Sequence, residues 1–271
     1  MPLFSYSKIL LICGLVFLYI PLVILIIFSF SNSQIINLWG HFTLDWYKKI
    51  FQDNDIISAA LISLQIALIA SLCATVLGTI VAYIMTRFSY FKSKSFLYGM
   101  VIIPLVLPDI VLGVSLLLMF TSLQNLIGWP NGRSIMTIII AHITFCTAYV
   151  TIIMQARIAS VDRSIEEAAM DLGAKPAKTF FQITLPQITP SLVASFLLAF
   201  TLSIDDLVIT EFVAGTNDPT LPMYIYSTVK NGPTPKINAL ATLMITIIST
   251  FIVIGAYITF RMESKRKKKH T

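Results

Sequence analysis

Long apolar runs separated by short polar segments make up most of the sequence. A membrane-spanning helix needs roughly 20 apolar residues, and these runs reach that length without the period-two alternation of barrel strands. The pattern predicts an all-α membrane protein, a single transmembrane domain over 1–271 with six spans at 9–30, 58–86, 96–123, 135–155, 191–214 and 239–260. No small-residue cleavage pattern follows the first run, so we interpret it as a span and not as a signal peptide.

The composition supports this interpretation. The 271 residues are 56% hydrophobic and only 12% charged, with a mean hydropathy of +0.84. A soluble domain carries about 25% charged residues, so a water-soluble protein is excluded. The three cysteines lie inside apolar runs, where thiols pack as small hydrophobic groups, and we expect neither a disulfide framework nor a metal site.

The distribution of positive charge predicts the orientation of the chain. Most of the 19 Lys and Arg residues lie before the first span, in the second and fourth connecting segments, or after the last span. Positive residues near span ends stay cytoplasmic, so we expect both termini on the cytoplasmic side. The basic tail, residues 261–271, is typical of a topology anchor that contacts anionic lipid, with a partner-binding tail as the alternative. The net charge of +6 therefore does not indicate a nucleic-acid partner.

The fourth connecting segment, residues 157–190, is the only long one on the predicted cytoplasmic side. It has the pattern of two short helices. The run Ser164 to Glu167 predicts a capping box at the start of the first helix, and Gly173 is placed to end it. Pro186 and Pro190 are expected to stop the second helix before the next span begins.

This segment contains a longer pattern: Glu167-Ala168-Ala169, three residues, Gly173, nine residues, Ile183, one residue, then Leu185-Pro186. The pattern resembles the EAA loop of ABC-importer permeases, the membrane subunits of binding-protein-dependent uptake systems. The resemblance implies the type I ABC importer permease fold. It also implies that the segment is a coupling loop whose Glu167, Ala168, Ala169 and Gly173 dock on a cytoplasmic ATPase. The alternative is an ordinary amphipathic connector.

The chemistry of the loop suits docking. Alanines permit close approach of a partner, and the acidic side chains of Glu166, Glu167 and Asp171 can pair with a partner's basic residues. The loop is not a nucleotide site, because Ala177 stands where a phosphate-binding loop needs glycine before its Lys-Thr pair. We therefore expect no catalytic residue and no cofactor in this chain, and the resemblance implies that a partner ATPase binds ATP and Mg.

Four carboxylates lie in or at the edge of predicted spans: Asp109, Asp205, Asp206 and Glu211. Ionised groups are costly in hydrocarbon, so they normally face a bundle interior or a water-filled cavity and mark a substrate path. From the helical rise, Asp109 and Asp205 each lie roughly 20 Å from the inner end of their spans, which predicts one shared anionic site. An unbroken helix cannot direct Asp205, Asp206 and Glu211 to one ligand, because they differ by about 100° or more around the axis.

Three features near these carboxylates have two interpretations each. Pro104 and Pro108 precede Asp109, and each frees a helix carbonyl that either suits an ammonium donor or only reflects a packing kink. Glu211 is expected at the outer boundary, either as a gate or as a solvated residue. Tyr226 flanks a span, where its ring either holds an amine by a cation-π contact or belongs to the interfacial aromatic belt.

Four further segments resemble the spermidine/putrescine branch of these permeases, and within it the second membrane subunit: Leu202-Ser203-Ile204-Asp205-Asp206-Leu207, Leu221-Pro222, Ile225-Tyr226-Ser227 and Asn238-Ala239-Leu240-Ala241-Thr242. This resemblance implies polyamine cargo, whose ammonium groups need anionic partners, and a place in the cytoplasmic (inner) membrane. It also implies a heterodimeric pore with a second permease subunit, two ATPase subunits and an extracytoplasmic polyamine-binding protein. That protein would meet the outer segments 31–57 and 215–236.

Other functions remain as alternatives. Related permeases for phosphonate, iron or similar solutes share parts of the pattern. An ion-driven secondary carrier would also hold buried acids, but it needs no docking loop, and its expected inverted repeat is not evident. His142 is interpreted as a hydrogen-bonded packing residue without a role, since no second His or Cys lies at metal-ligand spacing.

Overall fold

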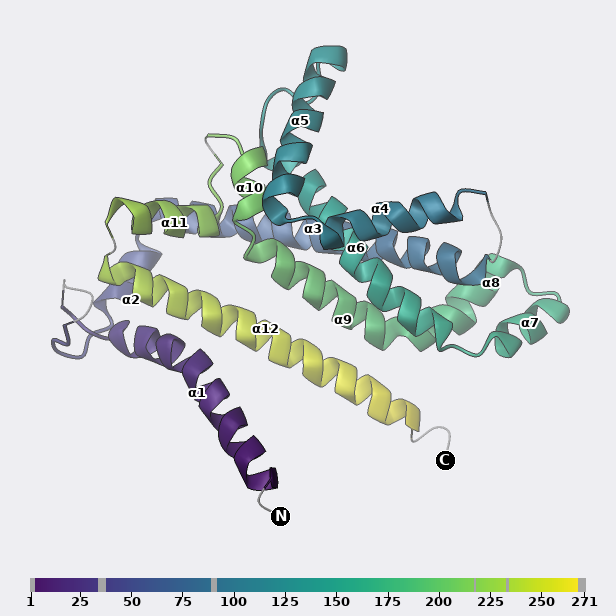
Figure 1. Cartoon of the computed structure of the whole chain (residues 1–271), viewed down its shortest axis with the longest axis horizontal. Helices are drawn as coiled ribbons and strands as arrows, with labels where there is room; N and C mark the ends of the chain where they lie inside the picture. The colour runs from purple at the N-terminus through teal and green to yellow at the C-terminus, as the bar shows by residue number, and fades with distance from the viewer. Residues whose placement is uncertain (1–2, 34–37, 89–91, 217, 233, 268–271) are drawn as a thin grey trace. The chain divides into compact units, whose positions relative to one another are not determined.

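The structure, a computed structural model, describes residues 3–33, 38–88, 92–216, 218–232 and 234–267, and in these ranges helices are joined by short non-helical segments (Figure 1). The elements in order are α1 (Leu3–Phe28), α2 (Asp45–Phe51), α3 (Asn54–Arg87), α4 (Lys94–Val106), α5 (Asp109–Ile127), α6 (Ile135–Ala159), α7 (Arg163–Asp171), α8 (Pro176–Thr179), the π-helix η1 (Phe180–Thr184), α9 (Leu185–Ile204), α10 (Val208–Val213), α11 (Leu221–Asn231) and α12 (Pro235–Lys267).

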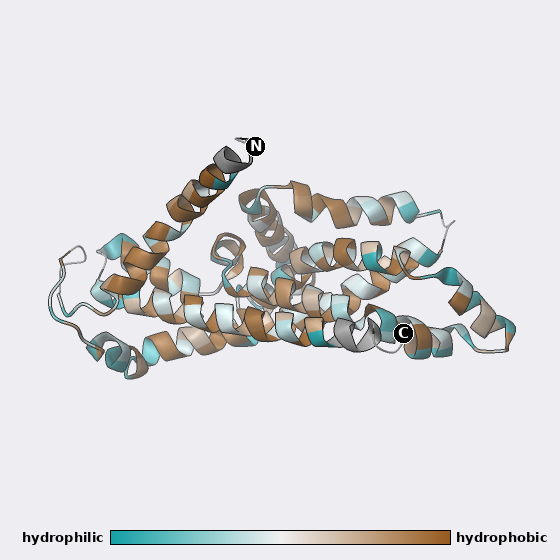
Figure 2. Ribbon diagram, turned by 90° about the horizontal axis from the view of Figure 1, so that it is seen from below, coloured by the Kyte–Doolittle hydropathy of each residue, from teal (hydrophilic) through white to brown (hydrophobic). Residues whose placement is uncertain are grey.

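Within these described ranges, six helical stretches are long and apolar enough to cross a membrane: Lys8–Phe28, Asn54–Arg87, Asp109–Ile127, Ile135–Ala159, Pro176–Ile204 and Pro235–Ile258. The prediction of an all-α, six-span membrane protein is therefore confirmed. Apolar residues run along most of α1, while polar residues gather mainly in connecting segments (Figure 2). The orientation of the termini stays a prediction, and the last part of the basic tail, residues 268–271, lies outside the described residues.

The third predicted span is not one helix, as the apolar run 96–123 suggested. Helix α4 ends at Val106, Leu107 and Pro108 are extended with ψ of 138° and 141°, and α5 starts at Asp109. A proline disfavours helical geometry at the residue before it, which explains the break at Leu107. Helix α5 turns sharply away from α4 (Figure 1).

The fifth predicted span, 191–214, is also broken. Helix α9 ends at Ile204, and the short helix α10 starts at Val208. Neither proline nor glycine lies between them. The prolines that were expected to stop the preceding helix do not do so, because α8, η1 and α9 continue without interruption through Pro186 and Pro190. The π-helical turn, which has a wider hydrogen-bond spacing than an α-helix, ends at Thr184, two residues before Pro186.

The chain divides into two compact units, Met1–Ser58 with Tyr224–Thr250, and Ala59–Met223 with Phe251–Thr271. Helix α6 forms the centre of the second unit and packs against α4, α9 and α10. Its Ile138, Cys146 and Met154 are fully buried. Helix α3 approaches α6 closely at Gly78, where an added Cβ would lie 2.7 Å from a methyl carbon of Val150.

An ion pair joins two segments of the first unit. The ammonium of Lys236 donates to the carboxylate of Asp53, whose other oxygen accepts from the backbone N–H groups of Asp55 and Ile56. Lys236 is the main cause that lowers the pKa of Asp53 below its ordinary value of 3.8. The pair therefore stabilises the fold above that pH, and the stabilisation is lost as the pH falls through the lowered pKa.

We predict that Lys236→Met lowers the free energy of unfolding by about 0.5–1 kcal/mol at pH 7, because Asp53 loses its cationic partner. The difference from the unmodified chain should shrink below about pH 4 and disappear once the carboxyl is protonated in both proteins. Thermal unfolding of the detergent-purified protein across this pH range measures it. A difference that stays constant down to pH 3 would contradict the role of the ion pair.

Candidate functional site

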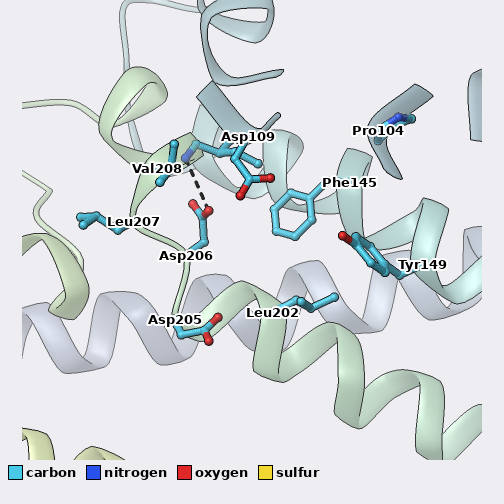
Figure 3. Close-up of a pocket in the computed structure, with 10 residues that line it drawn as sticks. Pro104, Asp109, Phe145, Tyr149, Leu202, Asp205, Asp206, Leu207 and Val208 are labelled. Atoms are coloured by element: carbon cyan, nitrogen blue, oxygen red, sulfur yellow. Dashed lines mark hydrogen bonds between the residues drawn. The ribbon is translucent and has the colours of Figure 1, made fainter. Parts of the chain in front are cut away.

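A cavity of about 260 Å³ lies where both helix breaks of the second unit meet (Figure 3). Asp109 comes from the α4–α5 break, and Asp205 and Asp206 come from the α9–α10 break. The remaining lining residues are mostly apolar or aromatic: Pro104, Phe145, Tyr149, Leu202, Leu207, Val208 and Ile209. The predicted shared site of Asp109 and Asp205 is therefore present in the geometry, and Asp206 lines the same cavity because the helix is broken beside it.

Asp205 lies at the C-terminal end of α9, as its C-cap residue. Helix C-termini carry unsatisfied carbonyls and a partial negative charge, which a cation stabilises and a carboxylate opposes. The Asp205 carboxylate is exposed in the single chain and makes no ion pair or hydrogen bond to another residue that the structure describes. A carboxylate beside helix carbonyls at this depth is a favourable site for an ammonium group.

The carboxylate of Asp206, unlike that of Asp205, is surrounded by hydrogen-bond donors. Its Oδ2 atom accepts from the backbone N–H and the hydroxyl of Thr210, at 2.8 and 2.7 Å, and Oδ1 lies 3.4 Å from the N–H of Ile209. The side chain thus satisfies free backbone N–H groups in the first turn of α10 and stabilises the start of this helix after the break. His142 Nε2 lies 3.4 Å from Oδ2, and the Asp206 side chain is only 10% exposed.

Asp109 is the first residue of α5, where the partial positive charge of the helix N-terminus stabilises a carboxylate. The side chain is exposed in the single chain. Helices α5 and α10 pack closely together, because Gly113 has no side chain: an added Cβ would lie 2.6 Å from the ring of Phe212 and 3.3 Å from the Cα of Ile209. This contact holds the two helix breaks beside each other.

The connecting loop 157–190 forms the compact helical structure that its sequence predicts, but with a different cap. Asp162 is the N-cap of α7, and its carboxylate accepts from the backbone N–H of Ser164 at 2.9 Å, a bond that lowers the pKa of Asp162. The predicted capping box at Ser164 and Glu167 is therefore wrong. Gly173 adopts φ of +87° after the end of α7, so its predicted place as the turn glycine is confirmed.

Glu166 is not available to a partner, contrary to its prediction as a docking residue. Its side chain is 6% exposed, and Oε2 lies 2.8 Å from Nε of Arg87, while Oε1 accepts from Nη2 of Arg87 and from the hydroxyl of Thr184 at 2.9 and 2.8 Å. The carboxylate therefore ties α7 to the end of α3 and to η1. Its neighbour Glu167 has a side chain that is 55% exposed and pairs only with the nearby Arg163 among the described residues.

The other predicted docking residues differ in exposure. Ala168, Asp171, Gly173 and Pro186 are exposed, Ala169 is half-buried, and Leu185 packs against the hydrophobic core.

The chain matches a known protein family over most of its length. Residues 74–269 match the model of the family described as binding-protein-dependent transport system inner membrane component. The chain belongs to this family.

Two relatives of this permease are similar over nearly their whole lengths. The putrescine transport system permease protein PotI of Escherichia coli (strain K12) is 46% identical over 258 residues, which cover 95% of this chain and 92% of that protein. The spermidine/putrescine transport system permease protein PotC of Haemophilus influenzae is 37% identical over 254 residues, which cover 94% of each chain.

Solved structures support the fold of the permease. A chain of a bacterial ABC transporter that imports the acidic polysaccharide alginate aligns with a TM-score of 0.76 at 18% identity, over 96% of this chain and 95% of that one. A chain of the MetNI methionine ABC transporter aligns with a TM-score of 0.64 at 15% identity, over 76% and 95%. The type I ABC importer permease fold that the loop resemblance implied is therefore confirmed.

Two predicted path residues of the permease lie away from the cavity lining. Glu211 is exposed on α10, and Tyr226, which is 52% exposed, belongs to α11 in the first unit. The sequence alone did not indicate the aromatic wall, Phe145 and Tyr149, or Thr210 as the main partner of Asp206. Apolar spans contain many aromatic residues, so these two carried no distinguishing signal.

Proposed function

We propose that this permease subunit conducts linear polyamines, putrescine or spermidine, through the cytoplasmic membrane as part of an ATP-driven importer. The observation that carries the proposal is the convergence of three carboxylates from two helix breaks on one cavity. Each ammonium group offers three hydrogen-bond donors and a positive charge, and charge attraction strengthens where water is excluded. The names of the two relatives support the same cargo.

The cavity walls suit the rest of a polyamine. Between its ammonium groups the substrate is a flexible methylene chain, which gains from apolar surface. Phe145 and Leu202 offer such surface, and the ring of Tyr149 adds a face for a cation-π contact (Figure 3). A phosphate or sulfate ion would meet three carboxylates here and be repelled.

The complete pore needs a second permease subunit. Asp109 and Asp205 are exposed in the single chain although they lie in or beside membrane-spanning helices, where exposure of a carboxylate to lipid is costly. A second, related subunit that covers these residues would turn the half-open cavity into a water-filled path. An extracytoplasmic polyamine-binding protein would deliver the substrate to segments 31–57 and 215–236.

The loop 157–190 would couple the pore to two cytoplasmic ATPase subunits, which bind ATP and Mg themselves. Glu167, Ala168 and Asp171 are exposed on α7, and Leu172 beside Gly173 is 90% exposed. Such a surface combines acidic groups with an apolar anchor, which is typical of a docking interface. The buried contacts of Glu166 would pass a movement of α7 on to α3 and η1.

Uptake of labelled putrescine tests the proposal in cells that lack this gene and every other polyamine importer. We expect the gene to restore uptake, spermidine to compete, and butylamine, which has one ammonium group on the same four-carbon chain, to compete much less. A Walker-motif variant of the partner ATPase should abolish the restored uptake.

Two results would contradict this assignment. Undiminished putrescine uptake in the deletion strain would show that putrescine is not the substrate of this permease. Uptake that survives loss of the ATPase but stops when the proton gradient collapses would indicate an ion-driven carrier.

A further inference from the structure

A buried histidine outside the cavity lining contacts Asp206. His142 is 1% exposed in the middle of α6, and its two ring nitrogens contact the hydroxyls of two other helices. Nδ1 lies 2.6 Å from the Ser203 hydroxyl on α9, and Nε2 lies 2.9 Å from the Thr210 hydroxyl on α10. The ring therefore joins both sides of the break between α9 and α10.

The proton positions follow from the number of donors. The Thr210 hydroxyl has one proton, which it donates to Oδ2 of Asp206 at 2.7 Å. Its oxygen must then accept from His142, so the proton of the ring lies on Nε2. Nδ1 shares a hydrogen bond with the Ser203 hydroxyl, which can donate or accept. The bond from Nε2 to Thr210 and the bond from Thr210 to Asp206 therefore both point toward the Asp206 carboxylate.

We infer that His142 is a positioning residue for polyamine binding: through Thr210 it fixes the Asp206 carboxylate at the cavity. Without the ring, the Thr210 hydroxyl loses its donor, and Asp206 loses the contact at 3.4 Å that restrains Oδ2. The carboxylate then keeps only its bonds from Ile209 and Thr210, so Oδ2 is held less firmly, and a polyamine must restrain it further on binding. This inference rests on the proposed function and deepens it, because it names a residue outside the cavity lining that sets the affinity of the site.

Two substitutions of His142 separate positioning from packing. His142→Leu fills much of the same space without a donor, whereas His142→Gln carries an amide N–H near the place of Nε2. In cells that express the complete importer, we expect His142→Leu to raise the KM for putrescine about tenfold. The maximal rate per transporter should stay within twofold, and His142→Gln should retain a KM within threefold of the unmodified importer.

A matched control lies on the same helix. Thr151 is also fully buried on α6, but its hydroxyl bonds only to the carbonyl of Thr147 in its own helix among the described residues. Thr151→Val should leave the KM unchanged. If the loss of any buried polar group on α6 raised the KM, this variant would also show a raised KM, and that result would overturn the inference.

A second pair of variants decides the matter if His142→Leu does not reach the membrane. Thr210→Val removes the hydroxyl that links His142 to Asp206, and Thr210→Ser keeps it. We expect a raised KM for the valine variant and a nearly unchanged KM for the serine variant. Equal KM values for valine and serine, or equal values for His142→Leu and His142→Gln, would overturn the inference. Absence of putrescine uptake by the unmodified importer would instead contradict the proposed function.

Discussion

Replacing Glu166 with alanine is expected to lower the free energy of unfolding by about 3–5 kcal/mol, the cost of leaving one partner of a buried ion pair without a counter-ion. The Glu166 and Arg87 side chains are only 6% and 10% exposed, and their charged groups lie 2.8 Å apart. Arg87 has no other carboxylate in contact among the described residues. The amount of protein in the membrane, by quantitative immunoblot, and thermal unfolding of the purified chain measure the loss.

The adjacent carboxylate supplies the control. Glu167→Ala removes only an exposed i,i+4 pair with Arg163, for which we expect at most about 0.5 kcal/mol. Its membrane abundance should be normal, while uptake falls if Glu167 contacts the ATPase. Normal abundance of Glu166→Ala would contradict the structural role of the buried pair.

A double variant tests whether the unpaired charge causes the loss. Combining Glu166→Leu with Arg87→Met removes both charges and leaves apolar groups of similar volume, which is often nearly neutral for a buried pair. We therefore expect the double variant to be more stable than Glu166→Ala alone. Stability equal to or below that of the single variant would show that the polar contacts of Thr184 and Val161 with this pair carry more of the energy than the charges do.

The loop contains two adjacent glutamates whose different roles could not be predicted from the sequence. Glu166 and Glu167 have the same chemistry, and a helix separates them by about 100° around its axis. Which one is buried depends on Arg87, which is 79 residues away in the sequence. The pattern of the loop identified the segment and its turn glycine correctly, because both depend on local conformation. It could not assign the two carboxylates, because that assignment depends on a tertiary contact.

In the cavity too, features that depend on residue type could be predicted, and features that depend on tertiary contacts could not. The cost of a carboxylate in hydrocarbon is a property of the residue and its depth, so Asp109, Asp205 and Asp206 were identified from the sequence. The break of the fifth span was not identified, because neither proline nor glycine lies there, and the bonds of Asp206 to the first turn of α10 form only in the folded structure. His142 was interpreted as a hydrogen-bonded packing residue, and its partners 61 and 68 residues away are what relate it to the cavity.

Replacing Asp205 with asparagine is expected to reduce polyamine uptake between tenfold and a hundredfold, which corresponds to about 1.4–2.7 kcal/mol of lost binding. Asp109 and Asp206 each lie at a helix N-terminus, which stabilises their charge without a ligand. Asp205 lies at a C-terminus and has no side-chain partner among the described residues. It is therefore the carboxylate that gains most from an ammonium group. Initial rates of labelled putrescine uptake, normalised to membrane abundance, measure the effect.

Glu211→Gln is the matched control for this experiment, because it makes the same change from acid to amide six residues further along, at an exposed position outside the cavity lining. We expect uptake within twofold of the unmodified permease. If Asp205→Asn behaves like Glu211→Gln, the Asp205 carboxylate is only solvated, and the charge that selects polyamines must lie elsewhere, on Asp109, on Asp206 or on the proposed second permease subunit. A large loss with Asp205→Asn alone would instead place the recognition of an ammonium group at the end of α9, where the helix carbonyls and the carboxylate act on the same ligand.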